Sequence, residues 1–368
     1  MSQTAIPFLF MRGGTSRGPY IRRSHLPQDR EALANVLLAA IGAGHPLNID
    51  GIGGGASVTT KVAMLSAAGY DEWADVDYFF AQVSGDEGLV DFVPTCGNIL
   101  SGVGPAAIEM GLIAPGETET VVRIRAVNTG ARVVANVKTP GGVVEYEGDT
   151  RIDGVPGSAA PIGLQFMDTI GSVTGAFLPT GRPIDEIEGV KVTCMDVTMP
   201  VVIGLAEDFG ITGYETRDEL DANTALLEHI ESVRRLAGER MGMGDVAKSV
   251  TPKFALLARA KAGGTIATRY FTPWSCHPTM AVTSSQCIAS CFLTPGTVAS
   301  GLAAIPNESP ATITLEHPLG SMDVLVDFVN GLNGFDLKSA GVVRTARKLA
   351  AGDLFVPAQV WRGHVAGS

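Results

Sequence analysis

The sequence contains few charged and few aromatic side chains, and it has no strongly basic segment. Charged residues make up 18% of the 368 residues, aromatic residues make up 6%, and the formal net charge is −11. Because an acidic chain without a basic stripe does not attract phosphate backbones, nucleic acid is not expected as a partner. A site for an anionic molecule must therefore be a local positive pocket within an acidic protein.

Long apolar runs are missing as well. The apolar run Ile6–Met11 is too short for the core of a signal peptide and lacks a basic lead and a cleavage site. No stretch approaches the length that crosses a membrane. We therefore expect a soluble protein of the cytoplasm without a membrane partner.

Cysteine is scarce and shows no regular spacing. The five cysteines are an odd number, which is typical of free thiols in a reducing compartment. Cys276, Cys287 and Cys291 near His277 could suggest zinc, but no CxxC pair occurs. Cys287 and Cys291 lie four residues apart, on one face of an expected helix, so we interpret them as core residues. We expect neither a metal nor a cofactor.

Apolar residues and glycine are abundant. The hydrophobic share of 45% and the 45 glycines indicate a globular protein with many tight turns. The length fits two domains. Residues 152–189 are rich in Gly, Pro and Ala without periodicity, which places the domain change there. We expect domains 1–185 and 186–368, with a last segment that can cross back to the first domain.

The segment Thr95–Asn98 predicts a loop that delivers Cys96 into the first turn of a helix. Apolar residues follow at helical spacing as far as Met110, and Pro105 is expected to kink that helix. A helix start offers unpaired backbone N–H groups, which bind anions and favour a thiolate. Gly97 lets the backbone approach a ligand closely. The alternative interpretation is a small buried cysteine.

A second candidate is the stretch Arg12–Gly18, which follows an apolar strand. Arg12, Thr15 and Ser16 together with free backbone N–H groups suit the binding of carboxylates. The alternative is an ordinary solvated glycine turn.

Lys61 is the third candidate. It follows a glycine-rich turn and begins an expected strand, flanked by Val62. The turn matches a loose dinucleotide fingerprint but follows no strand, and it is not a phosphate-binding Walker loop. A lysine among apolar residues can serve as a base. It can equally be an edge lysine that extends to water.

The second half repeats the order of strands, polar loop and helix start. The expected strand 266–271 leads to His277 and Thr279, before another helix. His277 is a candidate for carboxylate binding, or else a structural histidine.

Several motifs together resemble a known family. Residues Thr95–Asn98 resemble the first active-site motif of the diaminopimelate-epimerase superfamily. The segments Met11–Gly18, Asp50–Gly54, Thr60–Ala63 and Val343–Leu349 are similar to its 4-oxalomesaconate tautomerase and 2-methylaconitate isomerase branch. The resemblance implies an α+β fold. Two similar domains of mainly antiparallel sheet would each wrap around a central helix, with the active site in the cleft between them. A homodimer is compatible with the family.

The resemblance also implies roles for residues. Lys61 and Cys96 would be the acid and base. The amino-acid epimerases carry a second cysteine where this chain has Val282, so racemisation by two cysteines is not expected. The binding residues would then be Arg12, Thr15, Ser16, Gly97, Asn98, His277 and Thr279.

The function implied is a cofactor-independent isomerase. We expect a 4-oxalomesaconate tautomerase, working by a keto–enol or a 1,3-allylic proton shift in the degradation of gallate- or protocatechuate-type aromatic acids. The first alternative is a 2-methylaconitate cis–trans isomerase of propionate catabolism. The second is a non-catalytic carboxylate-binding protein of the same fold.

Overall fold

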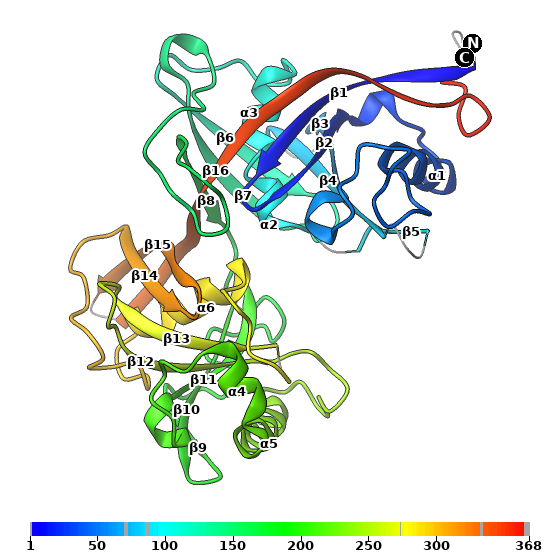
Figure 1. The fold of residues 1–368 in the computed structure, drawn as a ribbon. Helices are drawn as coiled ribbons and strands as arrows, with labels where there is room; N and C mark the ends of the chain where they lie inside the picture. Colours follow the sequence, from blue (N-terminus) through cyan, green and yellow to red (C-terminus); the bar gives the residue numbers. More distant parts are fainter. Residues whose placement is uncertain are drawn as a thin grey trace. The chain divides into compact units, whose positions relative to one another are not determined.

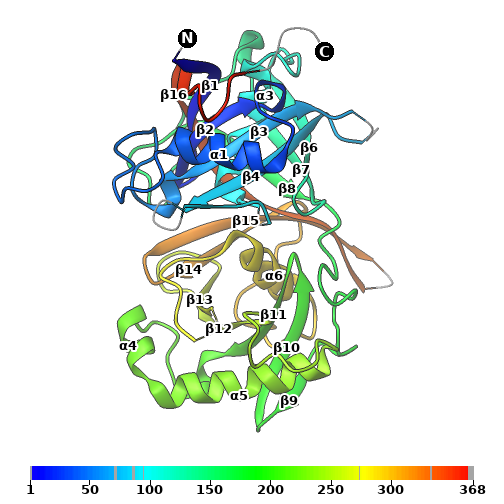
Figure 2. The ribbon, with the colours of Figure 1, turned by 90° about the vertical axis from the view of Figure 1, so that its right-hand side faces the viewer.

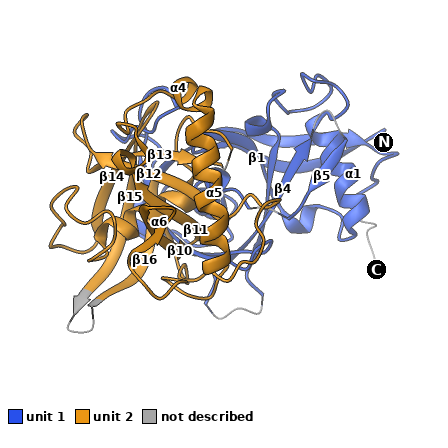
Figure 3. Ribbon diagram, turned by 90° about the horizontal axis from the view of Figure 1, so that it is seen from below, with its two compact units in different colours: residues 1–164, 344–368 blue, residues 165–343 orange. Residues whose placement is uncertain are grey.

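The computed structural model describes residues 2–69, 73–84, 88–93, 95–272, 274–331 and 334–363. The chain forms two compact units, which Figure 3 colours separately. Unit 1 contains residues 1–164 and 344–368, and unit 2 contains residues 165–343. The units divide between residues 164 and 165, whereas the composition suggested a boundary between 185 and 186. The segment from residue 344 onward groups with unit 1.

The strands of unit 1 form a ring, in which each strand is hydrogen-bonded to the next. The order is β1-β2-β3-β4-β6-β7-β8-β16, and β16 also pairs with β1, beside which it lies in Figure 1. The short strand β5 (Leu89–Asp91) extends β4. A closed ring leaves no exposed sheet edge. The bounds are β1 Gln3–Gly13, β2 Ser16–Arg22, β3 Lys61–Ala67, β4 Val76–Ser84, β6 Glu119–Ala126, β7 Arg132–Lys138, β8 Pro161–Phe166 and β16 Gly334–Pro357.

Two short helices pack against the strands of this ring. Helix α2 (Gly97–Leu100) contacts β1, β2 and β3, and helix α3 (Val103–Glu109) contacts β3, β6 and β7. The predicted single helix is therefore broken, and the break lies at Ser101 and Gly102 rather than at Pro105. Pro105 occupies the first turn of α3, where its missing N–H has no helical acceptor to lose.

Helix α1 (Arg30–Ile41) packs against β4 and β5 in unit 1. It has clear start and stop signals in the sequence. The side chain of Asp29 accepts a hydrogen bond from the Ala32 N–H at 2.8 Å, and Gly42 ends the helix with φ of 79°.

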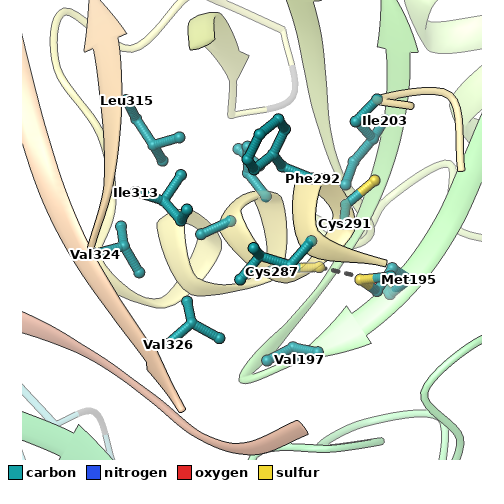
Figure 4. Packing of buried hydrophobic residues seen from close by; sticks show 14 of the residues in the cluster. Met195, Val197, Ile203, Cys287, Cys291, Phe292, Ile313, Leu315, Val324 and Val326 are labelled. Atoms are coloured by element: carbon teal, nitrogen blue, oxygen red, sulfur yellow. Dashed lines mark hydrogen bonds between the residues drawn. The ribbon is translucent and has the colours of Figure 1, made fainter. Parts of the chain in front are cut away.

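Unit 2 is a sheet in the order β9-β10-β11-β12-β13-β14-β15-β16. Helix α6 (Val282–Leu293) packs on β10, β11, β14 and β15, and Figure 2 shows it beside these strands. Figure 4 shows the core that α6 forms, in which Cys287 and Cys291 are fully buried, so their interpretation as core residues is confirmed. The bounds are β9 Asp185–Ile187, β10 Val190–Val197, β11 Met199–Leu205, β12 Lys253–Arg259, β13 Ile266–Phe271, β14 Ala311–His317 and β15 Gly320–Gly331.

The two units repeat one strand pattern. Along β1-β2-β3-β4-β6-β7 the pairings alternate between antiparallel and parallel. The same alternation recurs along β10-β11-β12-β13-β14-β15. The expectation of two similar α+β domains with a helix against each sheet is therefore confirmed. No helix in the described ranges is long and apolar enough to span a membrane.

The periodicity of residues 218–240 predicts one helix, and the structure has two. Helix α4 (Arg217–Ala222) ends at Asn223, whose side chain then caps α5 (Thr224–Arg240) by accepting from the Leu226 N–H at 3.1 Å. Asparagine competes for backbone hydrogen bonds in this way, so it favours a helix boundary over a helix interior.

Arg234 on α5 is fully buried, which is unusual for an arginine. Its guanidinium pairs with Glu231, with Nε and Oε2 2.7 Å apart. It also donates to the carbonyl oxygens of Val246, Ser249 and Pro252 at 2.9, 3.2 and 3.4 Å. One side chain therefore attaches α5 to the segment that leads into β12.

We predict that Arg234→Met lowers the free energy of unfolding by about 3–5 kcal/mol, because it leaves three carbonyl oxygens and a carboxylate without their donor. Urea unfolding measures the change. The control is Arg235→Met, since that side chain is 52% exposed and lies 3.8 Å from Asp245; its effect should stay within about 0.5 kcal/mol. Equal effects of the two variants would contradict the role of Arg234.

Candidate active site

The hairpin of β1 and β2 is the element around which the candidate residues of unit 1 are placed. Arg12 pairs with Arg17 and Gly13 with Ser16, so the turn is only Gly14 and Thr15, with φ of 50° at Gly14. The stretch Arg12–Gly18, for which the sequence suggested a carboxylate-binding glycine loop or an ordinary glycine turn, is therefore a tight hairpin. Thr15 is exposed at the turn, while Ser16 is buried at 3% exposure.

The Cys96 segment packs on the first glycines of this hairpin. A Cβ atom at Gly13 would lie 2.5 Å from the carbonyl oxygen of Asn98, and one at Gly14 would lie 2.1 Å from Asn98 Oδ1. Only glycine allows this approach. The backbone N–H of Thr15 also faces Asn98 Oδ1, at a long 3.4 Å. The hairpin therefore fixes the position of Asn98, two residues after Cys96.

The other end of the hairpin contacts Lys61. A Cβ atom at Gly18 would lie 1.8 Å from the Lys61 carbonyl oxygen. The seven residues from position 12 to 18 thus touch both the loop that carries Cys96 and the beginning of β3. Three predicted site residues belong to the hairpin itself: Arg12, Thr15 and Ser16. Two more, Lys61 and Asn98, contact its glycines.

Lys61 is the first residue of β3, as predicted, and it is partly buried. Its Nζ donates to Gln82 Oε1 at 2.5 Å and lies 5.4 Å from the centre of the Phe80 ring. Gln82 is the register partner of Lys61 on β4, and its amide group donates to Thr60 Oγ1 at 3.0 Å. A neutral amide therefore orients the amine without adding a negative charge.

Cys96 is the N-cap residue of α2, with φ of −130°. Because α2 has a single turn, the dipole of a long helix, which the sequence predicted, is not available here. The buried hydroxyls of Tyr20 and Tyr78 are close by: Tyr20 donates to the Ile99 carbonyl at 2.6 Å and Tyr78 to the Cys96 carbonyl at 3.4 Å. Burial, and next the neighbouring Cys96, raise the pKa of both tyrosines, so both remain donors.

Arg12 is already engaged within unit 1. Its Nη1 donates to the carbonyl oxygens of Gly14 and Thr345 at 2.9 and 3.0 Å and to Thr345 Oγ1 at 3.0 Å. Burial, and next the charge of Arg347, lower the pKa of Arg12. One arm of the guanidinium therefore braces the hairpin against β16. A carboxylate could be bound only by the remaining N–H groups.

His277 and Thr279 belong to unit 2 and contact each other. Nδ1 of His277 accepts from the Thr279 N–H at 3.0 Å, and burial lowers the pKa of this imidazole. A neutral ring then carries its proton on Nε2. Helix α6 begins only at Val282, with Ala281 as N-cap, so both residues lie in the loop before the helix.

Sequence reasoning did not find Gln82, Tyr20, Tyr78 or Thr345. Gln82 could have been found by pairing β3 with β4 in the correct register, which places it opposite Lys61. The two tyrosines give no signal in the sequence except that they stand at apolar strand positions. Among the residues that the structure describes, no three His, Cys, Asp or Glu side chains lie close enough to hold a metal ion.

Comparison with known proteins identifies the family. The model of the family described as PrpF protein matches residues 3–357. The chain belongs to the PrpF protein family. A solved structure described as methylitaconate-delta-isomerase superposes with a TM-score of 0.90 at 32% identity, covering 100% of this chain and 99% of that one.

Relatives of this PrpF family chain include named isomerases. It is 46% identical over 363 residues to 4-oxalomesaconate tautomerase of Pseudomonas putida, covering 99% of each chain. It is 45% identical to (4E)-oxalomesaconate Delta-isomerase of Novosphingobium, covering 95% of this chain and 97% of that protein. A more distant relative, 32% identical over 96% of this chain and 98% of its own, is 2-methyl-aconitate isomerase of Shewanella oneidensis.

We predict that Gly18→Ala lowers the free energy of unfolding by about 1–3 kcal/mol, because the new methyl group must displace the Lys61 backbone. Gly352→Ala is the matched control, since it changes another strand glycine of unit 1 at which a Cβ meets nothing within 4 Å. Thermal unfolding of both variants tests this. An unchanged melting temperature for Gly18→Ala would show that the contact is not essential.

A second prediction concerns thiol reactivity. Cys96 is partly exposed, and the four other cysteines are buried. Burial raises the pKa of Cys276 to about 11 and of Cys194 and Cys291 to about 12, so these thiols stay protonated at pH 8. Iodoacetamide should therefore add once to the native protein and not at all to Cys96→Ala. Intact-mass spectrometry counts the adducts, and a second adduct before unfolding would contradict the prediction.

Proposed function

We propose that this chain is a cofactor-independent isomerase that moves a proton within 4-oxalomesaconate. The observation that carries the proposal is the contact of the hairpin at residues 12–18 with both the Lys61 backbone and the Cys96 loop. That geometry occurs in a chain that is 46% identical to a protein named 4-oxalomesaconate tautomerase. We further propose that the protein works in the cytoplasm as a homodimer and that its reaction belongs to the breakdown of aromatic acids.

The reaction requires one base and one acid. As the proposed base, the amine of Lys61 takes a proton from a carbon next to a carbonyl group or double bond. The electron pair of that C–H bond becomes a new carbon–carbon double bond. The displaced π electrons move either to the carbonyl oxygen, which gives the enol, or to the far carbon of an allylic system. Cys96 Sγ gives its proton to that oxygen or carbon, and solvent restores both groups.

The negative charge that develops in this step needs hydrogen-bond donors. The backbone N–H of Gly97 and the side chain of Asn98 are proposed donors, because the hairpin holds Asn98 in one place. Thr15 in the turn and Ser16 at the beginning of β2 are proposed as further donors, together with the unengaged N–H groups of Arg12. Such donors cost no reorganisation at the moment of reaction when the fold fixes them in advance.

From unit 2, His277 and Thr279 are proposed to bind a carboxylate of the substrate. The N–H of Thr279 is engaged by His277 Nδ1, which leaves the Nε2–H of the neutral ring as the donor. Burial keeps this ring neutral, so it contributes a directed hydrogen bond rather than a charge.

Isomerisation of 2-methylaconitate is the second candidate. Its double bond migrates by the same removal and return of a proton, so Lys61 and Cys96 would keep their roles. The relative with that name is 32% identical to this chain, compared with 46% for the tautomerase, which favours 4-oxalomesaconate.

Solvent-deuterium incorporation tests the proposal. In D₂O, wild-type protein should exchange a carbon-bound proton of 4-oxalomesaconate, followed by NMR. Lys61→Ala and Cys96→Ala should each slow the exchange by about 10²–10⁴-fold, because each removes one proton-transfer group. The control Lys138→Ala, which changes an exposed lysine paired with Glu119, should exchange at the wild-type rate.

Three outcomes distinguish the candidates. Exchange only into 2-methylaconitate would move the chain to the second candidate. Binding of either acid without exchange would identify a carboxylate-binding protein without turnover. Exchange that persists in Lys61→Ala would refute the assignment of the base.

A further inference from the structure

Lys253 in unit 2 occupies the position that Lys61 occupies in unit 1. Each lysine is the first residue of a strand that pairs in parallel with the second strand of a hairpin, β2 for β3 and β11 for β12. In each unit the chain passes through helix between that hairpin and the lysine. The burial pattern along β3 and β12 is also the same: a partly buried lysine, four buried residues, one partly buried residue and one exposed residue.

The two lysines differ in what holds the amine. Lys61 donates to Gln82, its register partner on β4. Strand β13 pairs with β12 only from Phe254 onward, with Phe271 opposite Phe254, so Lys253 has no register partner on β13. Within the described ranges, its Nζ makes no hydrogen bond or ion pair. A half-buried ammonium group without an acceptor is costly unless a ligand supplies one.

Positive charges act on both Lys253 and His277. Arg217 and Lys253 both act on His277 and add to the effect of burial in lowering the pKa of that ring. Burial, and next the charge of Arg234, lower the pKa of Lys253 itself. Arg217 and Arg234 are each paired with a carboxylate, so among the described residues Lys253 supplies the uncompensated positive charge that acts on His277. An anionic ligand would neutralise this charge.

The carboxylates next to these two arginines are engaged by them. Asp221 pairs with Arg217, with Oδ2 and Nε 3.1 Å apart, and its Oδ1 accepts from the Cys276 N–H at 2.6 Å. Glu231 is held by Arg234. These carboxylates therefore leave Lys253 without a counter-ion from the described residues.

We propose that Lys253 is a substrate-binding residue of unit 2, whose ammonium group binds a carboxylate of the di- or tricarboxylate substrate beside the Nε2–H of His277. The inference rests on the proposed function for the identity of the acid. The equivalent lysines of the two units would thus have different roles: Lys61 transfers a proton, and Lys253 binds a negative charge. The half-buried strand position and the missing acceptor are the features that support it.

The test is the binding of tricarballylate, a saturated tricarboxylate without a double bond to move, by isothermal titration calorimetry. Lys253→Met and Lys253→Gln should each raise Kd about 10- to 100-fold, because each removes a charge-assisted hydrogen bond. Lys253→Arg keeps the charge and should stay within about 5-fold of wild type. The control Lys191→Met changes an exposed lysine of β10 and should bind as wild type.

Kinetics supply an independent readout. In the Lys253 variants, KM for 4-oxalomesaconate should rise by the same factor as Kd for tricarballylate, while kcat changes less than about 5-fold. A purely structural lysine would instead lower the melting temperature and leave KM and Kd unchanged.

Unchanged affinity in Lys253→Met and Lys253→Gln, or no binding of tricarballylate by the wild type, would overturn the inference. Its failure is distinguishable from failure of the proposed function. Wild-type deuterium exchange with an unchanged KM in the Lys253 variants would refute only the role of Lys253. Loss of tricarballylate binding in these variants, together with no exchange by the wild type, would refute only the isomerase.

Discussion

The close approach of a glycine hairpin to two other backbones is the constraint on which the site of unit 1 depends. Gly13 and Gly14 leave space for Asn98, and Gly18 leaves space for the Lys61 carbonyl oxygen. No side chain fits at these positions without moving the neighbouring chain, so the spacing of the candidate acid and base is set by backbone contact. Arg12 then braces the same hairpin against β16 through Thr345.

Much of the fold follows from local signals in the sequence, whereas the site depends on tertiary contacts. Helix α1 is predictable because Asp29 and Gly42 cap an apolar face, and β3 because apolar residues follow Lys61 without a break. The stretch after Arg12 was expected to be a loop with free backbone N–H groups, because the sequence alone does not show that Asn98 packs on its glycines. The two-helix form of α2 and α3 was likewise hidden, since apolar spacing continues across Gly102.

The two units have the same strand topology but different polar and charged residues around the equivalent lysine. In unit 1 the first residue of the repeated strand is oriented by Gln82, a neutral neighbour across the sheet. In unit 2 the charge of Arg234 acts on the equivalent residue, Lys253, and Lys253 and Arg217 both act on His277. Register alone produces part of this difference, because β4 extends alongside Lys61 whereas β13 stops one residue short of Lys253. Electrostatic asymmetry thus arises from strand length as well as from residue identity.

The discontinuity of unit 1 has a consequence for the order of folding. Its first strand pairs along its whole length with β16, in a register that matches Gln3 with Pro357 and Ile6 with Leu354. Unit 2 is encoded by one uninterrupted segment, residues 165–343, so all of its strands leave the ribosome before that partner of β1 exists. During synthesis the first unit must keep an unsatisfied strand edge, which is a template for association with other chains, until the last part of the protein emerges. All strands of unit 2 are therefore available for pairing during synthesis before β1 of unit 1 can pair with β16.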